Sequence, residues 1–164
     1  MNPQIQVVFY SVALLSALGL ILFSYSVLGA KPNFSATPSV TKNSDLSITT
    51  NFRAEDLGKR TANVTLNAQY TALIGCINPG GNLSPSKGMN LEQMLSNSIK
   101  IKPNDGKIKG SLTLNPPVVP SGSEICPNKN WSTSILSLTY ENVALDIKQR
   151  NSEVLGFDFG NLSK

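Results

Sequence analysis

The sequence predicts an all-β protein, an antiparallel immunoglobulin-like β-sandwich of about seven strands. Three observations support this fold class. Apolar residues recur at every second position in several segments, turn-forming residues separate these segments, and no long helical pattern occurs after residue 45. Because side chains alternate between the two faces of a strand, this spacing favours half-buried strands. A hydrophobic helix is expected at the N-terminus, before the sandwich.

The clearest strand is Asn63–Cys76. Apolar residues occupy every second position from Val64 to Cys76, and most residues between them are polar. We therefore expect a long strand with one buried face. The rest of the domain is expected to be organised around this strand, which ends at one of the two cysteines of the chain.

The composition excludes several kinds of chemistry. The chain has 164 residues, enough for one domain, and 15% of them are charged. It contains no histidine, which removes Ser-His-Asp and Cys-His catalysis and histidine-containing zinc sites. Two cysteines are too few for an all-cysteine zinc site. We expect neither a cofactor nor a metal.

The charge pattern does not indicate a nucleic-acid-binding protein. The net charge of +4 comes from 14 basic and 10 acidic residues. The basic residues are scattered along the sequence, with one short pair at Lys59-Arg60, and they do not alternate with aromatic residues. We interpret the charge as a contribution to solubility, and any attraction to anionic polymers or lipid headgroups would be unspecific.

Residues 1–30 are predicted to form a signal peptide or a membrane anchor. The segment Val7–Leu22 is almost entirely apolar, so it would enter a membrane during export. Small residues near position 30 fit cleavage, whereas the uncharged leader and the length of the apolar run favour retention. Lys31 would favour a cytoplasmic domain, but the cysteine pair and the glycosylation sequons outweigh it. Both alternatives place the domain in an extracellular or cell-surface location.

The segment after the leader predicts an extended linker over residues 31–44, because it is rich in Pro, Ser, Thr and Asn. The β-sandwich domain is then expected at residues 45–164. Its first strand is predicted at Asp45–Ala54, where apolar residues alternate with polar ones. A charged connection, Glu55–Thr61, leads to the long strand.

The middle of the chain carries fewer regular patterns. Residues 77–90 contain two prolines and three glycines, which predicts an irregular segment. A helix of at most two turns is expected next, because Leu91, Met94 and Leu95 would share one helical face.

A hairpin is predicted after this short helix. Its arms are Ser98–Lys102 and Lys107–Asn115, and the strong turn signal Pro103–Gly106 lies between them. Two prolines end the second arm. The following residues, Val118–Asn130, are expected to form a loop that carries Cys126.

A second long strand is predicted at Ser132–Ile147. Its apolar residues stand at even positions up to Tyr140 and at odd positions from Val143. Because a slip of one residue turns every later side chain to the other face, we expect a β-bulge near Glu141-Asn142 or a bend into a second sheet. A last strand is expected at Val154–Phe159, after a polar turn.

Cys76 and Cys126 are predicted to form a disulfide, because an even pair of cysteines in an exported chain is most simply a bridge. A redox pair is the alternative, but redox cysteines usually stand close together as C-x-x-C. The bridge would close a loop of about 50 residues. Trp131, the only tryptophan, is expected to pack beside it.

Four motifs resemble a family of small exported proteins known mainly from actinobacterial and archaeal genomes. The motifs are C-I-N-P-G-G-N at 76–82, G-K-I-K-G-S-L-T-L-N-P-P at 106–117, C-P-N-K-N-W at 126–131 and L-S-L-T-Y-E-N-V at 136–143. The resemblance covers residues 62–147 and implies a disulfide-tied sandwich and export. It implies no activity and no catalytic residues. The inserted segment Met89–Ser98 and the long N-terminal segment depart from the family pattern.

Other candidate ligand sites are weaker. Gly80-Gly81 would suit an anion-binding nest, although such glycines more often permit a tight loop next to a cysteine. The acidic residues are dispersed without a calcium-loop motif, and Asp105 belongs to a turn signal. The three methionines Met1, Met89 and Met94, without histidine, are too few for a copper carrier.

The sequence contains five N-x-S/T sequons. Asn82 and Asn130 are expected in loops, so they are the best glycosylation acceptors if the host modifies exported asparagines. The remaining three sequons begin at Asn33, Asn63 and Asn161.

These observations predict a non-enzymatic exported or cell-surface β-sandwich module with a structural or binding role. Its partners would be further copies of itself, through addition of the tail Lys31–Val40 to an open sheet edge, or components of the cell envelope. Residues 7–30 would lie in the membrane if the leader is retained. The alternative is a hydrolase of a surface polymer, with two carboxylates that folding brings within about 5–10 Å.

Overall fold

The computed structural model describes residues 30–162, with only the backbone described at residues 85–88. Residues from Pro32 onward form one compact unit. The predicted N-terminal hydrophobic helix lies outside the described residues, and no helix within residues 30–162 is long and apolar enough to cross a membrane. The elements are β1 (Asn33–Lys42), β2 (Ile48–Glu55), β3 (Ala62–Ile77), β4 (Leu83–Ile101), β5 (Ile108–Leu114), α2 (Gly122–Ile125), β6 (Ser132–Gln149) and β7 (Ser152–Leu162).

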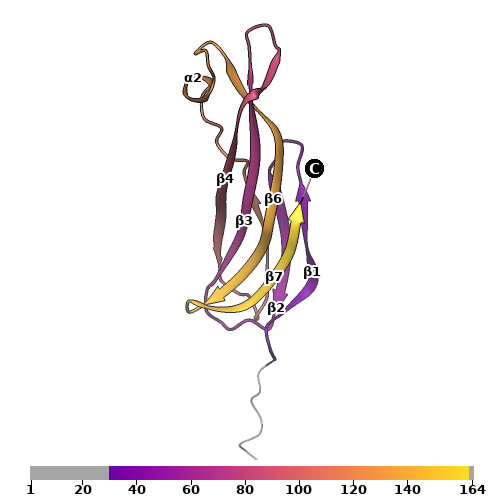
Figure 1. The fold of residues 1–164 in the computed structure, drawn as a ribbon. Helices are drawn as coiled ribbons and strands as arrows, with labels where there is room; N and C mark the ends of the chain where they lie inside the picture. The colour runs from indigo at the N-terminus through magenta and orange to yellow at the C-terminus, as the bar shows by residue number, and fades with distance from the viewer. Residues whose placement is uncertain (1–29, 163–164) are drawn as a thin grey trace, which may run out of the picture. The chain divides into compact units, whose positions relative to one another are not determined.

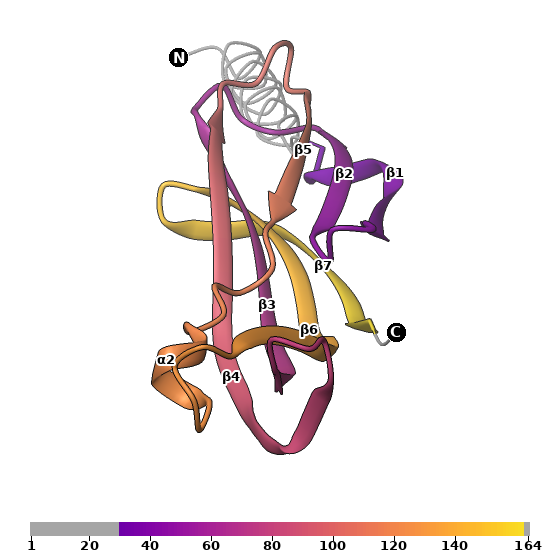
Figure 2. The same cartoon turned by 90° about the horizontal axis from the view of Figure 1, so that it is seen from above.

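The strands form two antiparallel sheets (Figures 1 and 2). One sheet has the order β1-β2-β5, and the other has the order β4-β3-β6-β7. Apolar side chains from both sheets form a single buried cluster between them. The antiparallel β-sandwich predicted from the alternation of apolar residues is therefore confirmed.

Strand β3 has the strict alternation that the sequence predicted. Every second side chain from Val64 to Cys76 is completely buried, and most residues between them are partly exposed. The strand is also internal to its sheet, because it pairs with β4 on one side and with β6 on the other. Both its hydrogen-bonding edges and one of its faces are thus covered by protein.

The predicted β-bulge in β6 is confirmed. Leu138 and Tyr140 are buried before it, and Val143 and Leu145 are buried after it. Between them Asn142 has a φ of 51°, and the pairing with β7 shifts between Tyr140 and Val143. The extra residue returns the apolar row to the core, and β6 stays in one sheet rather than bending into the other.

The predicted linker is wrong, because Asn33–Lys42 forms strand β1. It pairs along β2 with two register shifts. Strand β1 contributes few apolar side chains to the core. Pro38 is buried, and Phe34 packs edge-on against Phe157 of β7, with 5.9 Å between the ring centroids. An edge strand buries few side chains and tolerates proline, so its composition resembles that of a linker. The domain therefore begins near residue 32, not at 45.

The first predicted strand, Asp45–Ala54, begins three residues later, at Ile48. The preceding residues form a turn, in which the amide of Leu46 donates to the carbonyl of Asn43 at 3.1 Å. Leu46 itself has a φ of 69°, which is incompatible with a strand. Asp45 accepts hydrogen bonds from the amide and hydroxyl of Ser47, and these bonds hold its pKa below the usual value.

The predicted short helix is wrong, and the irregular segment predicted at residues 77–90 is confirmed only at residues 78–82. The chain from Leu83 to Ile101 is one strand, β4, paired with β3 on both sides of a register shift between Ser84 and Met89. Leu91 and Leu95 are packed against the core, whereas Met94 is 62% exposed. Pairing with a buried neighbour overrides the local helical spacing.

The predicted turn at Pro103–Gly106 is present, but it does not join a hairpin. The amide of Asn104 donates to the Lys107 carbonyl at 3.0 Å, and the reverse bond is 2.9 Å. Gly106 has a φ of 74°, which glycine adopts without strain. The arms then diverge, because β4 pairs with β3 while β5 pairs with β2 in the other sheet.

Tyr140 of β6 connects the two sheets. Its hydroxyl donates to the carbonyl of Leu46 at 2.8 Å, and the side chain is completely buried. The Lys42 ammonium lies 5.9 Å from the ring centroid and donates to the Leu138 carbonyl at 3.0 Å. Burial, with a smaller contribution from the charge of Asp45, raises the pKa of Tyr140 to about 12.

Alkaline pH should therefore reduce the free energy of unfolding. The unfolded chain ionises this tyrosine near pH 10.0, whereas folded Tyr140 stays protonated up to about pH 12. Its contribution to stability is complete below pH 10.0 and is lost as the pH rises through that window. Urea unfolding across this range measures the loss, and Tyr140→Phe should lose less than the wild type. Equal losses in the two proteins would show that Tyr140 is not responsible.

Candidate functional site at the disulfide end

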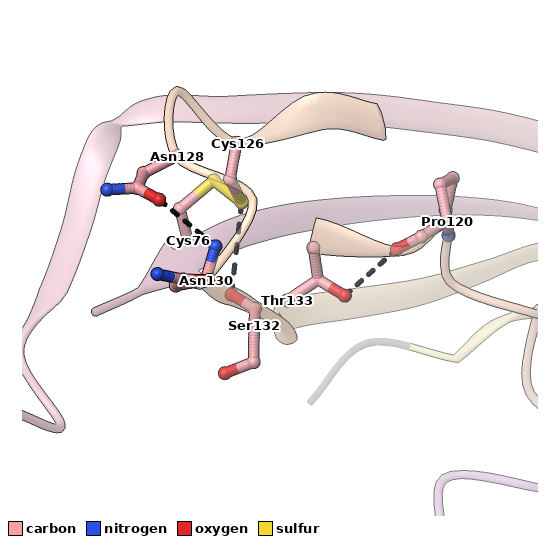
Figure 3. The surroundings of a disulfide bond; sticks show 7 residues. All are labelled: Cys76, Pro120, Cys126, Asn128, Asn130, Ser132 and Thr133. Carbon is pink, nitrogen blue, oxygen red and sulfur yellow. Dashed lines mark hydrogen bonds between the residues drawn. A yellow bond between two sulfur atoms is a disulfide. The ribbon is translucent and has the colours of Figure 1, made fainter. Parts of the chain in front are cut away.

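One end of the sandwich is built around the bond between Cys76 and Cys126 (Figure 3). The two Cα atoms are 5.8 Å apart and the two residues are 50 positions apart in sequence. Cys76 is completely buried at the end of β3. Cys126 lies directly after α2, so the bridge ties the loop between β5 and β6 to the central strand, as the sequence predicted.

The loop that carries Cys126 is ordered by local bonds. The Ser121 amide donates to the Glu124 carboxylate at 2.9 Å, which supports the first turn of α2. The Thr133 hydroxyl donates to the Pro120 carbonyl at 2.9 Å (Figure 3). Trp131 is half-buried, and its carbonyl oxygen lies so close to Gly122 that a Cβ there would be 1.8 Å away. Only glycine fits at that position.

The Gly80-Gly81 segment forms a self-contained turn. The Gly81 amide donates to the Asn78 carbonyl at 2.9 Å, and the Asn82 amide donates to the Asn78 side chain at 2.9 Å. Gly81 has a φ of 79°. Because these two amides are already bonded inside the turn, the geometry favours a tight loop over an anion-binding nest.

The structure brings the two preferred sequons to this end. Asn82 lies in the turn between β3 and β4, Asn130 lies between α2 and β6, and both are exposed. Figure 3 shows Asn130 beside the bridge, with its amide bonded to the Asn128 side chain at 3.1 Å. The remaining sequons lie in strands: Asn33 in β1, Asn63 in β3 and Asn161 in β7.

Folding also brings acidic residues together. Glu55 and Asp105 line one open hollow of about 520 Å³ on the β1-β2-β5 sheet, together with Arg53, Lys107 and Lys109. The hollow is thus mixed in charge. Among the described residues, no three potential acidic, cysteine or histidine metal ligands come together.

The two described methionines do not form a ligand pair. Met89 is paired with Ile74 on the inner side of β4, whereas Met94 is paired with Gln69 and is 62% exposed. Side chains five positions apart on a strand point to opposite faces. Met1 lies outside the described residues.

Basic residues that are scattered along the sequence gather at the opposite end of the sandwich. We call this the basic end and define it as residues 53–61, 100–109 and 148–153, which surround the β2–β3, β4–β5 and β6–β7 connections. It holds nine basic and four acidic residues, a net charge of +5 compared with +4 for the whole chain. The local signals were the pair Lys59-Arg60 and the four lysines within residues 100–109, and topology brings these two groups together.

The comparisons with known proteins identify no family. No protein-family model matches the sequence, and no curated protein sequence is similar to it. The structure is similar, with a TM-score of 0.26 and 12% identity, to a β-glucuronidase from glycoside hydrolase family 2. The match covers 81% of this chain and 11% of the β-glucuronidase chain. A likeness at this level supports no inference about activity.

Breaking the disulfide should lower the melting temperature without unfolding the sandwich. A bridge across 50 residues stabilises by roughly 4 kcal/mol in the chain-entropy model, or about 10–15 °C for a domain of this size. Differential scanning calorimetry of wild type and Cys76→Ser/Cys126→Ser, each with and without reductant, provides the measurement and the control. Equal melting temperatures for oxidised and reduced wild type would contradict the expected contribution.

Proposed function

We propose that the protein is a non-enzymatic exported or cell-surface β-sandwich module with a structural or binding role. The observation that carries this proposal is the disulfide between Cys76 and Cys126, because such bridges persist in oxidising, extracytoplasmic compartments. Its position supports a structural purpose, since it fixes the loop before β6 to the most buried strand. The apolar leader of the sequence supports export.

The intact mass of the protein isolated from its host tests export directly. We expect a mass lower than that of the reduced chain by two hydrogen atoms, because the bridge forms. The mass should also include sugar at Asn82 and Asn130 if the host glycosylates exported proteins. The same measurement reports whether residues 1–30 are retained. Two free thiols in the native protein would overturn the exported role, whereas Asn82→Gln and Asn130→Gln assign any added mass.

We further propose that the sandwich is immunoglobulin-like. The sheet β4-β3-β6-β7 faces the sheet β1-β2-β5, and the chain crosses between the sheets three times, after β2, after β4 and after β5, as in Greek-key sandwiches. The family suspected from the motifs at 76–82 and 126–131 would then consist of disulfide-tied modules of this class.

Self-association is proposed to use β1. This strand lies at a sheet edge, where it pairs irregularly with β2 and leaves most of its side chains exposed. Assembly would therefore exchange β1 between copies, rather than add a free tail to an empty edge. The same strand would then leave the neighbouring β2 of its own chain.

Locking β1 in place should prevent such assembly. Thr41 and Thr49 are directly paired, so Thr41→Cys/Thr49→Cys would fix the strand to its own chain. We expect this protein to remain monomeric under oxidising conditions, by light scattering, while Thr41→Ser/Thr49→Ser still assembles. Oligomers of the locked protein at the wild-type level would exclude strand exchange.

The alternative function, a carboxylate-based hydrolase of a surface polymer, would use Glu55 and Asp105. Both acids line one hollow, which is the observation in its favour. Such an enzyme should release soluble fragments from cell-envelope polysaccharide. Glu55→Gln or Asp105→Asn should reduce that release by about 100-fold or more, whereas Glu124→Gln, at the disulfide end, should not.

A further inference from the structure

The basic end is a single ordered surface, because its three connections are bonded to each other. The Leu57 amide in the β2–β3 connection donates to the Gly106 carbonyl in the β4–β5 connection at 2.9 Å. The Gln149 side chain at the end of β6 donates to the carbonyls of Arg60 at 2.6 Å and Gly58 at 3.1 Å. Basic residues distant in sequence are therefore held in fixed positions relative to one another.

Five of the basic side chains converge around two adjoining hollows. One hollow, of about 400 Å³, is lined by Lys100, Lys148 and Arg150. The other, of about 440 Å³, is lined by Lys59, Arg60 and Arg150, so Arg150 belongs to both. All five side chains are exposed.

The spacing of these cations follows from strand pairing. Lys100 of β4 and Lys148 of β6 are both paired with Asn63 of β3, so their backbones are about 10 Å apart on one face. This spacing suits several separate anionic groups rather than one small ion.

Nearby acids offset only part of this charge. The basic end contains four acidic residues and nine basic ones. No acidic residue lines either of the two hollows, whereas five basic residues do. The surface around the two hollows therefore remains positive.

The chain enters the sandwich at this same end. Asn33, the first residue of β1, is paired with Glu55, the last residue of β2. The preceding 24 residues, Val7–Ala30, carry no charge. Only two residues separate Ala30 from Asn33 in the sequence, and a link of this length spans at most about 10 Å.

We infer that the basic end binds the anionic phospholipid headgroups of the membrane that Val7–Ala30 enters. This inference rests on the proposed cell-surface role with a retained anchor. The headgroups supply multiple phosphates in a plane, which matches the separated cations of the two hollows. The disulfide end would then face away from the membrane.

Vesicle binding by residues 30–164 tests the inference. This fragment contains both cysteines and all the core residues of the part of the chain that the structure describes, so we expect it to fold without the leader. We expect it to sediment with phosphatidylcholine vesicles containing about one-third phosphatidylglycerol at least tenfold better than with pure phosphatidylcholine vesicles. Binding should weaken steeply with added salt, because the interaction is electrostatic. Equal binding to both vesicles would overturn the inference.

Substitutions locate the surface. Each neutralised basic residue should weaken binding about fivefold, so Lys100→Gln/Lys148→Gln/Arg150→Gln should weaken it about 100-fold. Two matched single substitutions serve as controls. Lys148→Gln should weaken vesicle binding about fivefold, whereas Lys129→Gln, at the disulfide end, should leave binding unchanged. Circular dichroism melting of each variant separates lost binding from lost folding. Equal losses for the two single variants would overturn the inference.

Two further measurements identify the ligand and the orientation. If a soluble sulfated polysaccharide binds the protein as tightly as the anionic vesicles do at the same salt concentration, the ligand is an anionic polymer rather than a lipid, and the inference is overturned.

In the full chain in anionic nanodiscs, amide exchange should slow at residues 57–61 and 149–152 and stay unchanged at residues 78–82. Protection of 78–82 instead would reverse the orientation. These results leave the exported role untouched, because the native mass tests that role separately.

Discussion

The burial of one face of β3 is the constraint on which the other strands depend. Seven alternate side chains, from Val64 to Cys76, have no solvent exposure, and burying each large apolar one stabilises the fold by roughly 1.5–3 kcal/mol. To cover this face, β1, β2 and β5 must form the opposite sheet. To satisfy its backbone, β4 and β6 must pair on either side. Tyr70 lies in the core, and its hydroxyl adds a side-chain hydrogen bond to Gln93 of β4 at 3.1 Å. The bridge at Cys76 then extends the same fixed frame to the loop before β6.

The sequence predicted the parts of the fold that this constraint controls directly. Strand β3 and the bulged strand β6 have complete apolar rows, because both are internal strands with one face in the core. Two of the four edge strands, β1 and most of β4, were missed for the opposite reason. In strand β1 only Pro38 is buried, and in β4 the inward-facing Gln93 interrupts the apolar row, so neither has a clear period. The divergence of β4 and β5 after a correctly predicted turn depends on which sheet each strand joins, and no local pattern contains that information.

The candidate sites also divide into those that a local sequence pattern predicts and those that depend on the order of the strands. The disulfide was predictable because two cysteines allow one pairing, and the exposed positions of Asn82 and Asn130 were predictable because turn-forming residues surround them. The basic end was not predictable, since its cations come from segments separated by up to about 100 positions and their convergence requires the strand order. Likewise, Glu55 and Asp105 meet in one hollow only because β2 pairs with β5.

Antiparallel topology also explains why the two ends differ in chemistry. Each strand reverses direction, so the β3–β4 connection and the loop before β6 emerge at one end, while the β2–β3, β4–β5 and β6–β7 connections emerge at the other. The first group contains the bridge and both loop sequons; the second contains nine of the 14 basic residues and adjoins the start of β1. A glycan needs free solvent around its asparagine, and a cationic surface acts only when it is close to an anionic one. The loop sequons and the cationic surface lie at opposite ends of the strands, so solvent around the first does not prevent contact of the second with an anionic surface. A module joined to a membrane before β1 would satisfy both requirements.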